Sequence, residues 1–474
     1  MSVEPRTDLV GRKVIFTDVD VITKKNIVSV LKAALTTHNI NQSCIDYLYQ
    51  YNNGVQPILN RVKDTRPEIN NKIVVNRANE ITSFKVGYLL GEPLQYVSRS
   101  SNDKTATEKI TQLNEFMYSE DKASKDKELA DWFTICGTSY RMILPNKDGG
   151  TDDSPFHIYT LDPRQTFVVY HNGLGNKPVM GVKFVKRSDE TVVYSVYTET
   201  DYYEIVNDSI VKNEPHILHT IPIVEYPANS ARLGAFEIVI PLLDAYNLTV
   251  SDRLNGLEQF IQALIKFVNV DISPEQFKEL KDLGGIKFKS TSDNPADVDY
   301  ITPELNQTNT QTILNDMYQT ILTICGMPNR NGGSSTSDTG SAVIMRDGWE
   351  VAEAKAKDTE LMFKRSEKAF LRIALDIAKT ISGLDLKVSQ VDVRFTRRNY
   401  ENISNKSTVL TTMLNNGKIH PLLAFQHCGM FPDAELAYKM SAEYAEMQEK
   451  KALEREEAMA KEQKKDGKND GNSE

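Results

Sequence analysis

The spacing of the hydrophobic residues changes three times along this 474-residue chain. From residue 24 to residue 138, apolar residues recur at intervals of three and four, which predicts helices. Between residues 140 and 226 they alternate with polar residues and turn signals, which predicts an antiparallel β region. The helical spacing returns at residue 235. Residues 1–22 are polar and are expected to be extended.

The first two parts of the chain are therefore expected to contain helices followed by strands. The predicted helices cover residues 24–35, 41–51, 76–90, 110–118 and 126–138. The predicted strands cover residues 140–144, 157–161, 166–170, 179–186, 191–197, 202–206 and 221–226.

The middle of the chain is its most informative part. A helical pattern over 235–267 leads into a compact insert, 268–305, and a second helical pattern follows over 309–325. The loop-forming run MPNRNGGSSTSDTGS occupies 327–341. A third helical pattern, 342–381, is about 60 Å long at roughly 1.5 Å per residue. Two helices with a small module at one tip and a loop at the other indicate a pillar lining a channel in a ring, rather than an enzyme pocket.

The first of these helices has two faces. One carries apolar residues and the other polar residues, so we expect one face to pack and the other to meet solvent or a lumen. The apolar stripe is Val250, Leu254, Leu257, Ile261 and Leu264, and the polar stripe is Ser251, Asn255, Glu258, Gln262 and Lys266. The insert is predicted to hold a short helix over 274–283 and strands over 286–288 and 298–301.

The C-terminal part begins with the third helix, whose charged, alanine-rich middle at 353–360 needs little packing. A strand over 386–395 should follow it. Further helices are predicted over 404–415, 421–427 and 432–457. The last residues are rich in Lys, Glu, Gly and Asn, a composition typical of disorder.

Composition narrows the class of protein. Hydrophobic residues make up 40% and charged residues 26%, as in ordinary folded proteins. No run approaches eighteen apolar residues and the N-terminus has no apolar core, so we expect neither a membrane span nor a secretory signal. The net charge of −9 argues against ordinary tight DNA binding, but suits a protein past which DNA must slide. The four cysteines form no CxxC, which favours buried thiols over a zinc site.

Motifs for catalysis are missing from the sequence. There is no G-x-x-x-x-G-K-[ST], no H-E-x-x-H and no G-x-S-x-G. Paired residues that could bind a metal are more often solvated surface; they are Asp18 with Asp20, Asp297 with Asp299, and His216 with His219. Trp132 with Cys136 at helical spacing indicates core packing. We therefore expect no catalytic residue, no metal and no cofactor.

The glycine-rich run at 327–341 allows three interpretations. Backbone amides with glycine freedom can form a phosphate cradle, but a P-loop follows a strand and this run follows a helix. The run could be a surface linker. A mobile loop at the lumen of a ring is the interpretation that the flanking helices favour.

Six segments resemble the portal proteins of tailed bacteriophages, in the family typified by the portal of phage SPP1. They are RPEINNKIVVN (66–76) running into KVGYLLGEPL (85–94), ADWFTICGTSY (130–140), LDPRQTFVVY (161–170), IPIVEYP (221–227) and PLLDAYNLTVSD (241–252). They follow the family's order. The chain departs from the family after the glycine-rich run, where related portals often read Ser-Gly-x-Ala-Leu and this chain reads Thr339-Gly-Ser-Ala-Val343.

The resemblance implies an α+β portal fold with a mixed α/β wing, a long helical stem, a small α/β clip insert and a helical crown. The implied regions are a wing (1–234), a stem helix (235–267), a clip (268–305), a second stem helix (306–326), a tunnel loop (327–341), a long helix with a returning wing strand (342–400), a crown (401–456) and a disordered tail (457–474).

The resemblance also implies function. Portals form a ring, usually a homododecamer, at one capsid vertex, the channel through which DNA is packaged and ejected. The implied partners are the terminase large subunit, head–tail connector proteins, and the major capsid and scaffold proteins, with transient contact to double-stranded DNA and no membrane. The protein would be assembled in the host cytoplasm and located in the virion. The alternatives are a head–tail adaptor ring, which is usually shorter, and a packaging enzyme, which needs the missing P-loop.

Site residues follow from the same resemblance. The tunnel loop would include Arg330, Asn331, Gly332, Gly333, Ser334, Ser335, Asp338 and Gly340. Arg253, Lys266 and Arg330 are candidates for transient contact with DNA phosphates in the lumen, and the alternative for each is a solvated or intersubunit charge. Lys278 and Lys281 would belong to the partner surface of the clip.

Overall fold

The chain forms two compact units, each of which is built from separate segments. Unit 1 comprises Tyr47–Ile81 and Phe236–Cys325, and unit 2 comprises Val10–Asp46, Thr82–Ala235 and Gly326–Glu474. The computed structural model describes residues 10–99, 104–146, 154–261, 264–269, 273–275, 278, 295–301, 307–329, 348–396, 403–431 and 434–466.

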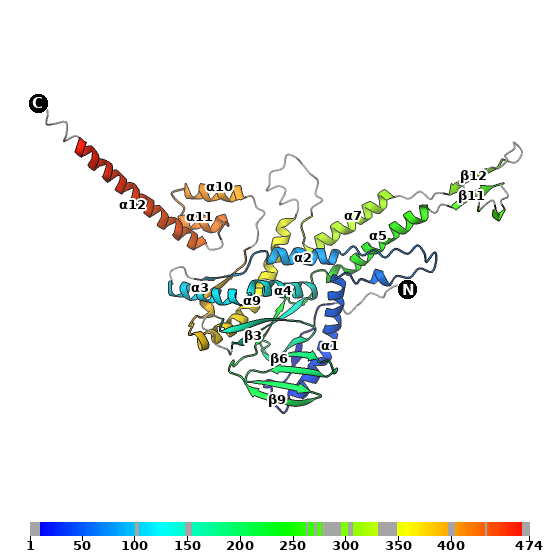
Figure 1. Ribbon diagram of the computed structural model, residues 1–474, viewed down its shortest axis with the longest axis horizontal. Coiled ribbons are helices and arrows are strands. Elements are labelled where there is room, and N and C mark those ends of the chain that lie inside the picture. The colour runs from blue at the N-terminus through cyan, green and yellow to red at the C-terminus, as the bar shows by residue number, and fades with distance from the viewer. Residues whose placement is uncertain are drawn as a thin grey trace. The chain divides into compact units, whose positions relative to one another are not determined.

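Helices and strands are both abundant, which confirms the predicted mixture of α and β structure (Figure 1). The helices are α1 (Ile27–Asn52), α2 (Arg77–Leu89), α3 (Lys104–Ser119), α4 (Lys122–Cys136), α5 (Ile240–Ile261), α7 (Gln307–Cys325), α9 (Trp349–Ser382), α10 (Ile403–Leu414), α11 (Pro421–Cys428) and α12 (Ala434–Asp466), with 3-10 turns η1 (Pro57–Asn60), η2 (Glu237–Val239) and η3 (Val388–Gln390). The strands are β1 (Ile15–Thr17), β2 (Gln95–Ser98), β3 (Thr138–Pro145), β4 (Phe156–Leu161), β5 (Thr166–His171), β6 (Pro178–Lys186), β7 (Val192–Tyr197), β8 (Asp201–Val206), β9 (Ser209–Pro215), β10 (Ile223–Pro227), β11 (Leu264–Val268), β12 (Asp297–Ile301) and β13 (Val391–Arg394).

The β region of unit 2 divides into two larger sheets rather than one. The six-stranded sheet has the order β1-β5-β6-β7-β8-β9, and the three-stranded sheet has the order β10-β3-β4. The β region is predicted to be antiparallel, but strand β1 runs parallel to β5, so the first sheet is mixed. Strands β1, β2 and β9 were not predicted. Strand β2 pairs with β13 instead, which brings the chain after α9 back beside residues 95–98.

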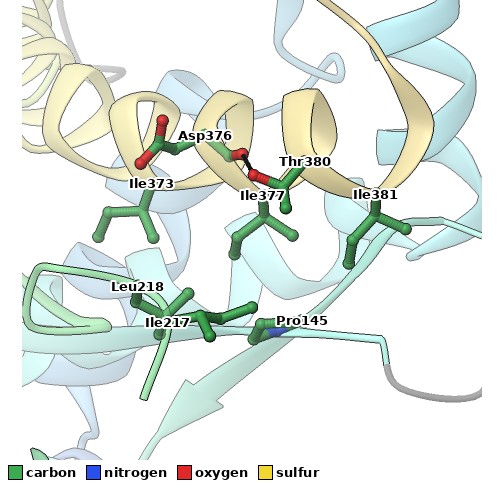
Figure 2. A pocket seen from close by; sticks show the side chains of 8 residues that line it. All are labelled: Pro145, Ile217, Leu218, Ile373, Asp376, Ile377, Thr380 and Ile381. Carbon is green, nitrogen blue, oxygen red and sulfur yellow. Dashed lines mark hydrogen bonds between the residues drawn. The ribbon is translucent and has the colours of Figure 1, made fainter. Parts of the chain in front are cut away.

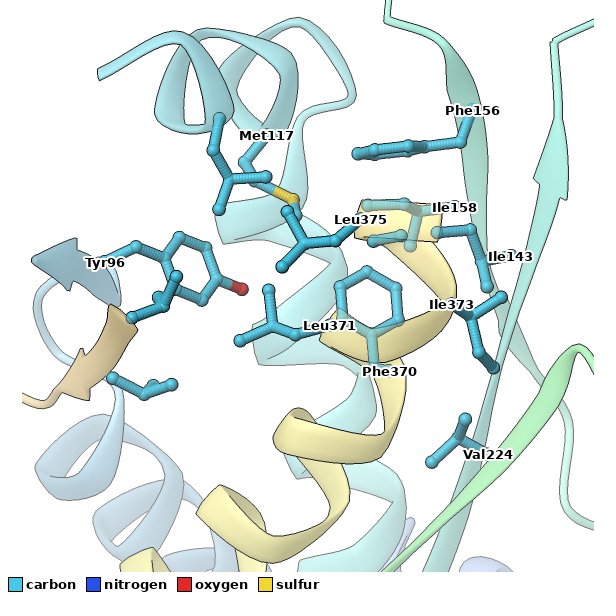
Figure 3. Packing of buried hydrophobic residues seen from close by; sticks show 14 of the residues in the cluster. Tyr96, Met117, Ile143, Phe156, Ile158, Val224, Phe370, Leu371, Ile373 and Leu375 are labelled. Carbon is cyan, nitrogen blue, oxygen red and sulfur yellow. The ribbon is translucent and has the colours of Figure 1, made fainter. Parts of the chain in front are cut away.

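The larger core of unit 2 is built around α9. Phe370, Leu371 and Leu375 of this helix pack among strand residues such as Phe156 and Ile158 (Figure 3). The apolar residues of α9 are concentrated in its second half, whereas residues 353–362 are half-buried or exposed, which confirms that the charged middle of the helix needs little packing. The position of α9 in unit 2 is therefore fixed mainly by its C-terminal half.

A second core lies between α1 and the six-stranded sheet. Ile27 and Leu31 of α1 are buried with Phe167 and Val169 of β5. The sequence predicts two helices here, but α1 is continuous. The buried stripe of α1 continues through His38, which is 1% exposed and packs against Phe167 with ring centroids 4.4 Å apart. A polar residue in the apolar stripe made one helix look like two.

A cluster of buried charges joins α4, β3 and α9. The Glu367 carboxylate accepts contacts from Lys122 Nζ at 3.0 Å, Arg141 Nη1 at 3.4 Å and the Tyr226 hydroxyl at 2.7 Å. Asp126 pairs with Lys122 at 2.7 Å and with Arg141 at 2.5 Å. Burial disfavours the Glu367 anion, but Lys122 and Arg141 outweigh burial and hold the pKa of Glu367 below its usual value. The Glu367 carboxylate therefore stays ionised, and the ion pairs link α4, β3 and α9.

Unit 1 contains α5 and α7, which pack side by side (Figure 1). Strands β11 and β12, between them in sequence, pair antiparallel from Leu264 opposite Ile301 to Val268 opposite Asp297. The predicted helix over 235–267 is wrong at both ends, because η2 precedes α5 and residues 264–268 form a strand. The sequence Leu-Ile-Lys-Phe-Val has high β propensity, and a paired strand satisfies its backbone.

Other predicted boundaries also change. The strand predicted over 386–395 is shorter, because a 3-10 turn precedes β13. Helix α12 continues to Asp466, so the tail predicted to be disordered from residue 457 is helical over its first ten residues, which are rich in helix-forming Glu, Lys and Ala. In the insert, strand 298–301 is confirmed as β12, residues 274, 275 and 278 are helical, and strand 286–288 lies outside the described residues.

Candidate functional site: paired helices and the ends of the glycine-rich segment

Three buried polar side chains on α5 bind an extended segment of unit 1. We call this segment, residues 70–76, the strap. The side chains are spaced by four residues and accept hydrogen bonds from alternate backbone amides of the strap. The bonds join the amide nitrogens of Asn71, Ile73 and Val75 to Asn255 Oδ1, Ser251 Oγ and Asn247 Oδ1, at 2.7, 3.0 and 2.9 Å.

The regular spacing of these bonds has a geometric cause. Four helical residues rise about 6 Å, and two extended residues rise roughly 6.6 Å, so the two periods nearly match. Ser251 is 0% exposed and Asn255 is 4% exposed. The polar stripe predicted to face solvent or a lumen is therefore, at these two positions, buried against the protein's own backbone.

The apolar stripe of α5 is only partly covered. Val250 and Leu254 are half-buried, and Leu257 is 44% exposed. On α7, Leu314 is buried while Ile313 is 51% exposed. The packing of the two helices thus leaves apolar side chains at the surface of unit 1.

The proposed DNA-contact residues do not share one element. Arg253 lies on α5, is half-buried, and donates from Nη1 to Gln311 Oε1 of α7 at 2.6 Å. Lys266 lies on strand β11, opposite Asp299 of β12, rather than on the predicted helix. Arg330 lies outside the described residues, so the three are not brought together in the described structure.

A cluster that the sequence did not predict joins α2, α5 and α7 in unit 1. The guanidinium of Arg77 lies 4.0 Å from the ring centroid of Tyr318 and 5.7 Å from that of Tyr246. Glu80 pairs with Arg77 at 2.6 Å and accepts the Tyr318 hydroxyl at 2.7 Å. These residues are far apart in sequence and form no motif. The cluster ties the start of α2 to both paired helices.

The flanks of the glycine-rich segment are structured in unit 2. Gly326 has φ of +65°, and a Cβ there would lie 2.8 Å from Cγ of Lys355 on α9. On the other flank, Trp349 at the start of α9 packs on Phe84 and Tyr88 of α2, with centroids 6.1 and 5.9 Å apart. Both flanks are therefore fixed against packed helices.

Of this segment, residues 330–341 are outside the described residues. The predicted tunnel-loop residues, Arg330, Asn331, Gly332, Gly333, Ser334, Ser335, Asp338 and Gly340, are all outside the described residues. Of the predicted clip residues, Lys278 is exposed and Lys281 is outside the described residues.

The thiols and potential metal ligands of the described residues do not gather into a metal site. All four cysteines are buried free thiols, as predicted. No group of three or more His, Cys, Asp or Glu side chains in the described ranges could hold a metal ion. A cavity of about 20 Å³ lies between α9 and residues 145 and 217–218 (Figure 2). Ligand pockets are usually above roughly 300 Å³, so this is a packing gap. None of the described helices is both long and apolar enough to cross a membrane.

Comparison with known protein families identifies the family of this chain. The chain belongs to the phage portal proteins. The family model that matches it, phage portal protein of the SPP1 Gp6-like type, covers residues 34–463. This span contains both paired helices, the insert between them, α9 and most of α12.

The chain is also similar, at low sequence identity, to proteins in solved structures of gene transfer agent particles. One similar structure is the neck of an empty gene transfer agent particle, with 10% identity, a TM-score of 0.43, and coverage of 75% of this chain and 90% of that chain. Another is the virion of a native gene transfer agent particle, with 11% identity, a TM-score of 0.41, and coverage of 82% of this chain and 94% of that chain. No curated protein matches the sequence.

Proposed function

We propose that this chain forms a closed ring at one vertex of a phage capsid, and that the ring is the channel for packaging and ejecting DNA. The observation that carries the proposal is the portal family match over residues 34–463. Twelve subunits is the number that the family resemblance implies. The same match favours a portal over a head–tail adaptor ring.

The proposed ring assigns roles to the parts of the chain. Helices α5 and α7 are the stem, the insert with β11 and β12 is the clip, and residues 401–456 are the crown. Residues 1–234 are the wing, and residues 342–400 are the long helix with the returning wing strand. Closed rings use head-to-tail contacts between two different faces of the subunit. The exposed Leu257 and Ile313 are apolar side chains that such a contact would cover.

The channel must bind DNA weakly along its length. DNA carries one negative charge per about 1.7 Å of its axis, so a lumen rich in lysine and arginine would hold it in place. The net charge of −9 supports a channel wall that does not hold DNA in place. Arg253, Lys266 and Arg330 make transient phosphate contacts, and Arg253 must exchange its bond to Gln311 to do so. The work of packaging comes from a separate ATPase.

The remaining partners are assigned to other surfaces. The clip, including Lys278 and Lys281, docks the terminase large subunit and then the head–tail connector. The ring is surrounded by major capsid and scaffold proteins, is assembled in the host cytoplasm and remains in the virion. The protein acts as a structural conduit and catalyses no reaction.

The tunnel loop provides the functional test. The double variant Gly332→Pro with Gly333→Pro stiffens the segment because proline fixes φ. We expect it to leave ring yield by gel filtration unchanged and to lower the DNA packaged per capsid. The matched control, Ser334→Ala with Ser335→Ala, changes side chains in the same segment without stiffening it and should package normally. Normal packaging by the proline variant would return the segment to a surface linker.

A further inference from the structure

The three C-terminal helices bury too few side chains among themselves to be stable as an independent unit. Helices α10, α11 and α12 form what we call the C-terminal module. Among its described side chains only Ala424, Phe425 and Cys428 are buried. Phe425 packs on Phe431 and Tyr438, with ring centroids 5.4 and 6.0 Å apart. A core of three side chains is far below what an independent helical unit requires.

A row of large apolar side chains lies along the opposite face of α12. Leu436, Met440, Tyr444 and Met447 are 52%, 63%, 59% and 46% exposed. Their spacing of four, four and three residues places them on one side of the helix, about 16 Å long. Tyr438, which faces Phe425, lies two residues from Leu436 and Met440 and so points away from this side. We call the four residues the α12 stripe.

The described part of the chain does not cover the second half of α12. From Glu443 to Glu457 every residue is exposed. A helical segment of this length is marginal in water without tertiary packing. It nevertheless carries Tyr444, Met447 and Leu453, which are costly to leave in water. The exposed stripe therefore indicates a surface that another chain covers.

Charge and hydrophobicity indicate what covers it. Residues 403–431 contain Lys406 and Lys418 and no acidic residue, whereas residues 434–449 contain four glutamates and one lysine. The first segment also exposes large apolar side chains, namely Val409, Leu414, Leu423 and Met430. The chain thus carries a basic segment with exposed apolar side chains, on α10 and α11, and an acidic apolar stripe on α12, and their charges complement each other.

We propose that the α12 stripe docks on the α10–α11 surface of an adjacent copy of this chain. Because the two surfaces differ, the contact is head-to-tail, and repeated from copy to copy it closes into a ring. The inference therefore rests on the proposed portal ring. It assigns the C-terminal module an assembly role, in which each copy completes the core of its neighbour.

The first experiment adds charge to the stripe of the full-length protein. Met440→Glu with Tyr444→Glu places two carboxylates where the neighbour should pack, at a high desolvation cost. The control, Ser441→Glu with Ala445→Glu, adds the same charge to exposed positions off the stripe. We expect the protein concentration at which rings dissociate, measured by mass photometry, to rise about tenfold or more for the stripe variant and much less for the control. Circular dichroism shows whether the dissociated subunits remain folded.

The second experiment identifies the docking surface. Leu423→Cys with Met440→Cys should cross-link on mild oxidation into a ladder of dimers, trimers and larger species, because each copy uses two different surfaces. The control, Leu423→Cys with Ser441→Cys, should stay largely monomeric on a denaturing gel. Dimers without larger species, or no cross-link, would overturn the head-to-tail docking.

The outcomes separate this inference from the proposed function. Rings that form normally and are equally stable in the stripe variant and its control would overturn the inference and leave the portal ring standing. A stripe variant with stable rings that loses binding of a different virion protein would identify another occupant and overturn it as well. A parent protein that forms no ring would overturn both.

Discussion

Removing one hydroxyl, in Ser251→Ala, tests whether α5 holds the strap. Ser251 is fully buried, and its Oγ accepts from the amide of Ile73 at 3.0 Å and donates to the Asn247 carbonyl within α5 at 2.8 Å. The variant deletes one buried atom and leaves the Ile73 amide without that acceptor. A donor left unsatisfied away from water costs about 1–3 kcal/mol, and Ile73 is half-buried, so the strap should detach more readily by an amount in the lower part of that range.

The same substitution should act on the helix in the opposite direction. Alanine has a higher helix propensity than serine, by up to about 0.7 kcal/mol, so α5 itself should not loosen. The assay is hydrogen–deuterium exchange by mass spectrometry. We expect exchange of a peptide covering residues 70–76 to rise by a factor in the lower part of roughly 5- to 150-fold, the equivalent of 1–3 kcal/mol. Exchange across α5 should stay the same or fall slightly.

A matched control is present on the same helix. The hydroxyl of Thr249 donates only to the Ala245 carbonyl of α5, at 2.8 Å. Thr249→Ala therefore deletes a hydroxyl and raises helix propensity without touching the strap. Unchanged exchange over 70–76 in Ser251→Ala, or the same increase in both variants, would refute the reasoning.

Three further substitutions test the cores of the chain. Burial lowers the pKa of His38 from 6.5 to about 4, although the carbonyl of Arg164 hydrogen-bonds its ring. The free energy of unfolding is therefore fully present above pH 6.5 and falls by up to about 3 kcal/mol as the pH drops towards 4. His38→Gln should flatten that part of the pH profile measured by urea unfolding. Arg141→Met leaves the buried carboxylates of Glu367 and Asp126 with Lys122 as their one cation and should lower the free energy of unfolding by about 3–5 kcal/mol. The control Arg187→Met removes an exposed ion pair and should cost less than about 1 kcal/mol. Equal shifts of the denaturant midpoint in the two variants would contradict the buried cluster. Gly326→Ala forces a side chain into left-handed backbone and towards a lysine of α9, and should lower the melting temperature by an amount equivalent to about 1–2 kcal/mol, whereas no change would mean that this flank is loose.

The sequence predicts most elements of the fold, because local spacing reports which face is buried. The seven predicted strands of the β region and the helices α2, α7, α10 and α11 are present close to their expected bounds. The misses have local causes. His38 is a polar residue in a buried stripe, and β9 is an edge strand whose exposed Lys212 and Glu214 hide its pattern. Residues 264–268 continue the hydrophobic spacing of α5 but pair as a strand.

The candidate site was less predictable, since its contacts join distant segments. Asn247, Ser251 and Asn255 form a four-residue repeat that could have indicated a polar ladder, but the strap that they bind lies more than 170 positions earlier in the chain. A polar stripe on a helix usually faces water, and nothing local distinguishes this one. The same limit applies to the pairing of Glu367 with Arg141, which only the packing of α9 on β3 brings about.

The state of assembly of the purified chain tests the central claim most directly. Native mass spectrometry combined with negative-stain imaging measures the number of copies and the presence of a central hole. The portal account predicts a perforated ring, with a mass of roughly 0.6 MDa for twelve copies of the 53.5 kDa chain. A monomer or dimer at every concentration tested, or a large assembly without a central opening, would contradict the account.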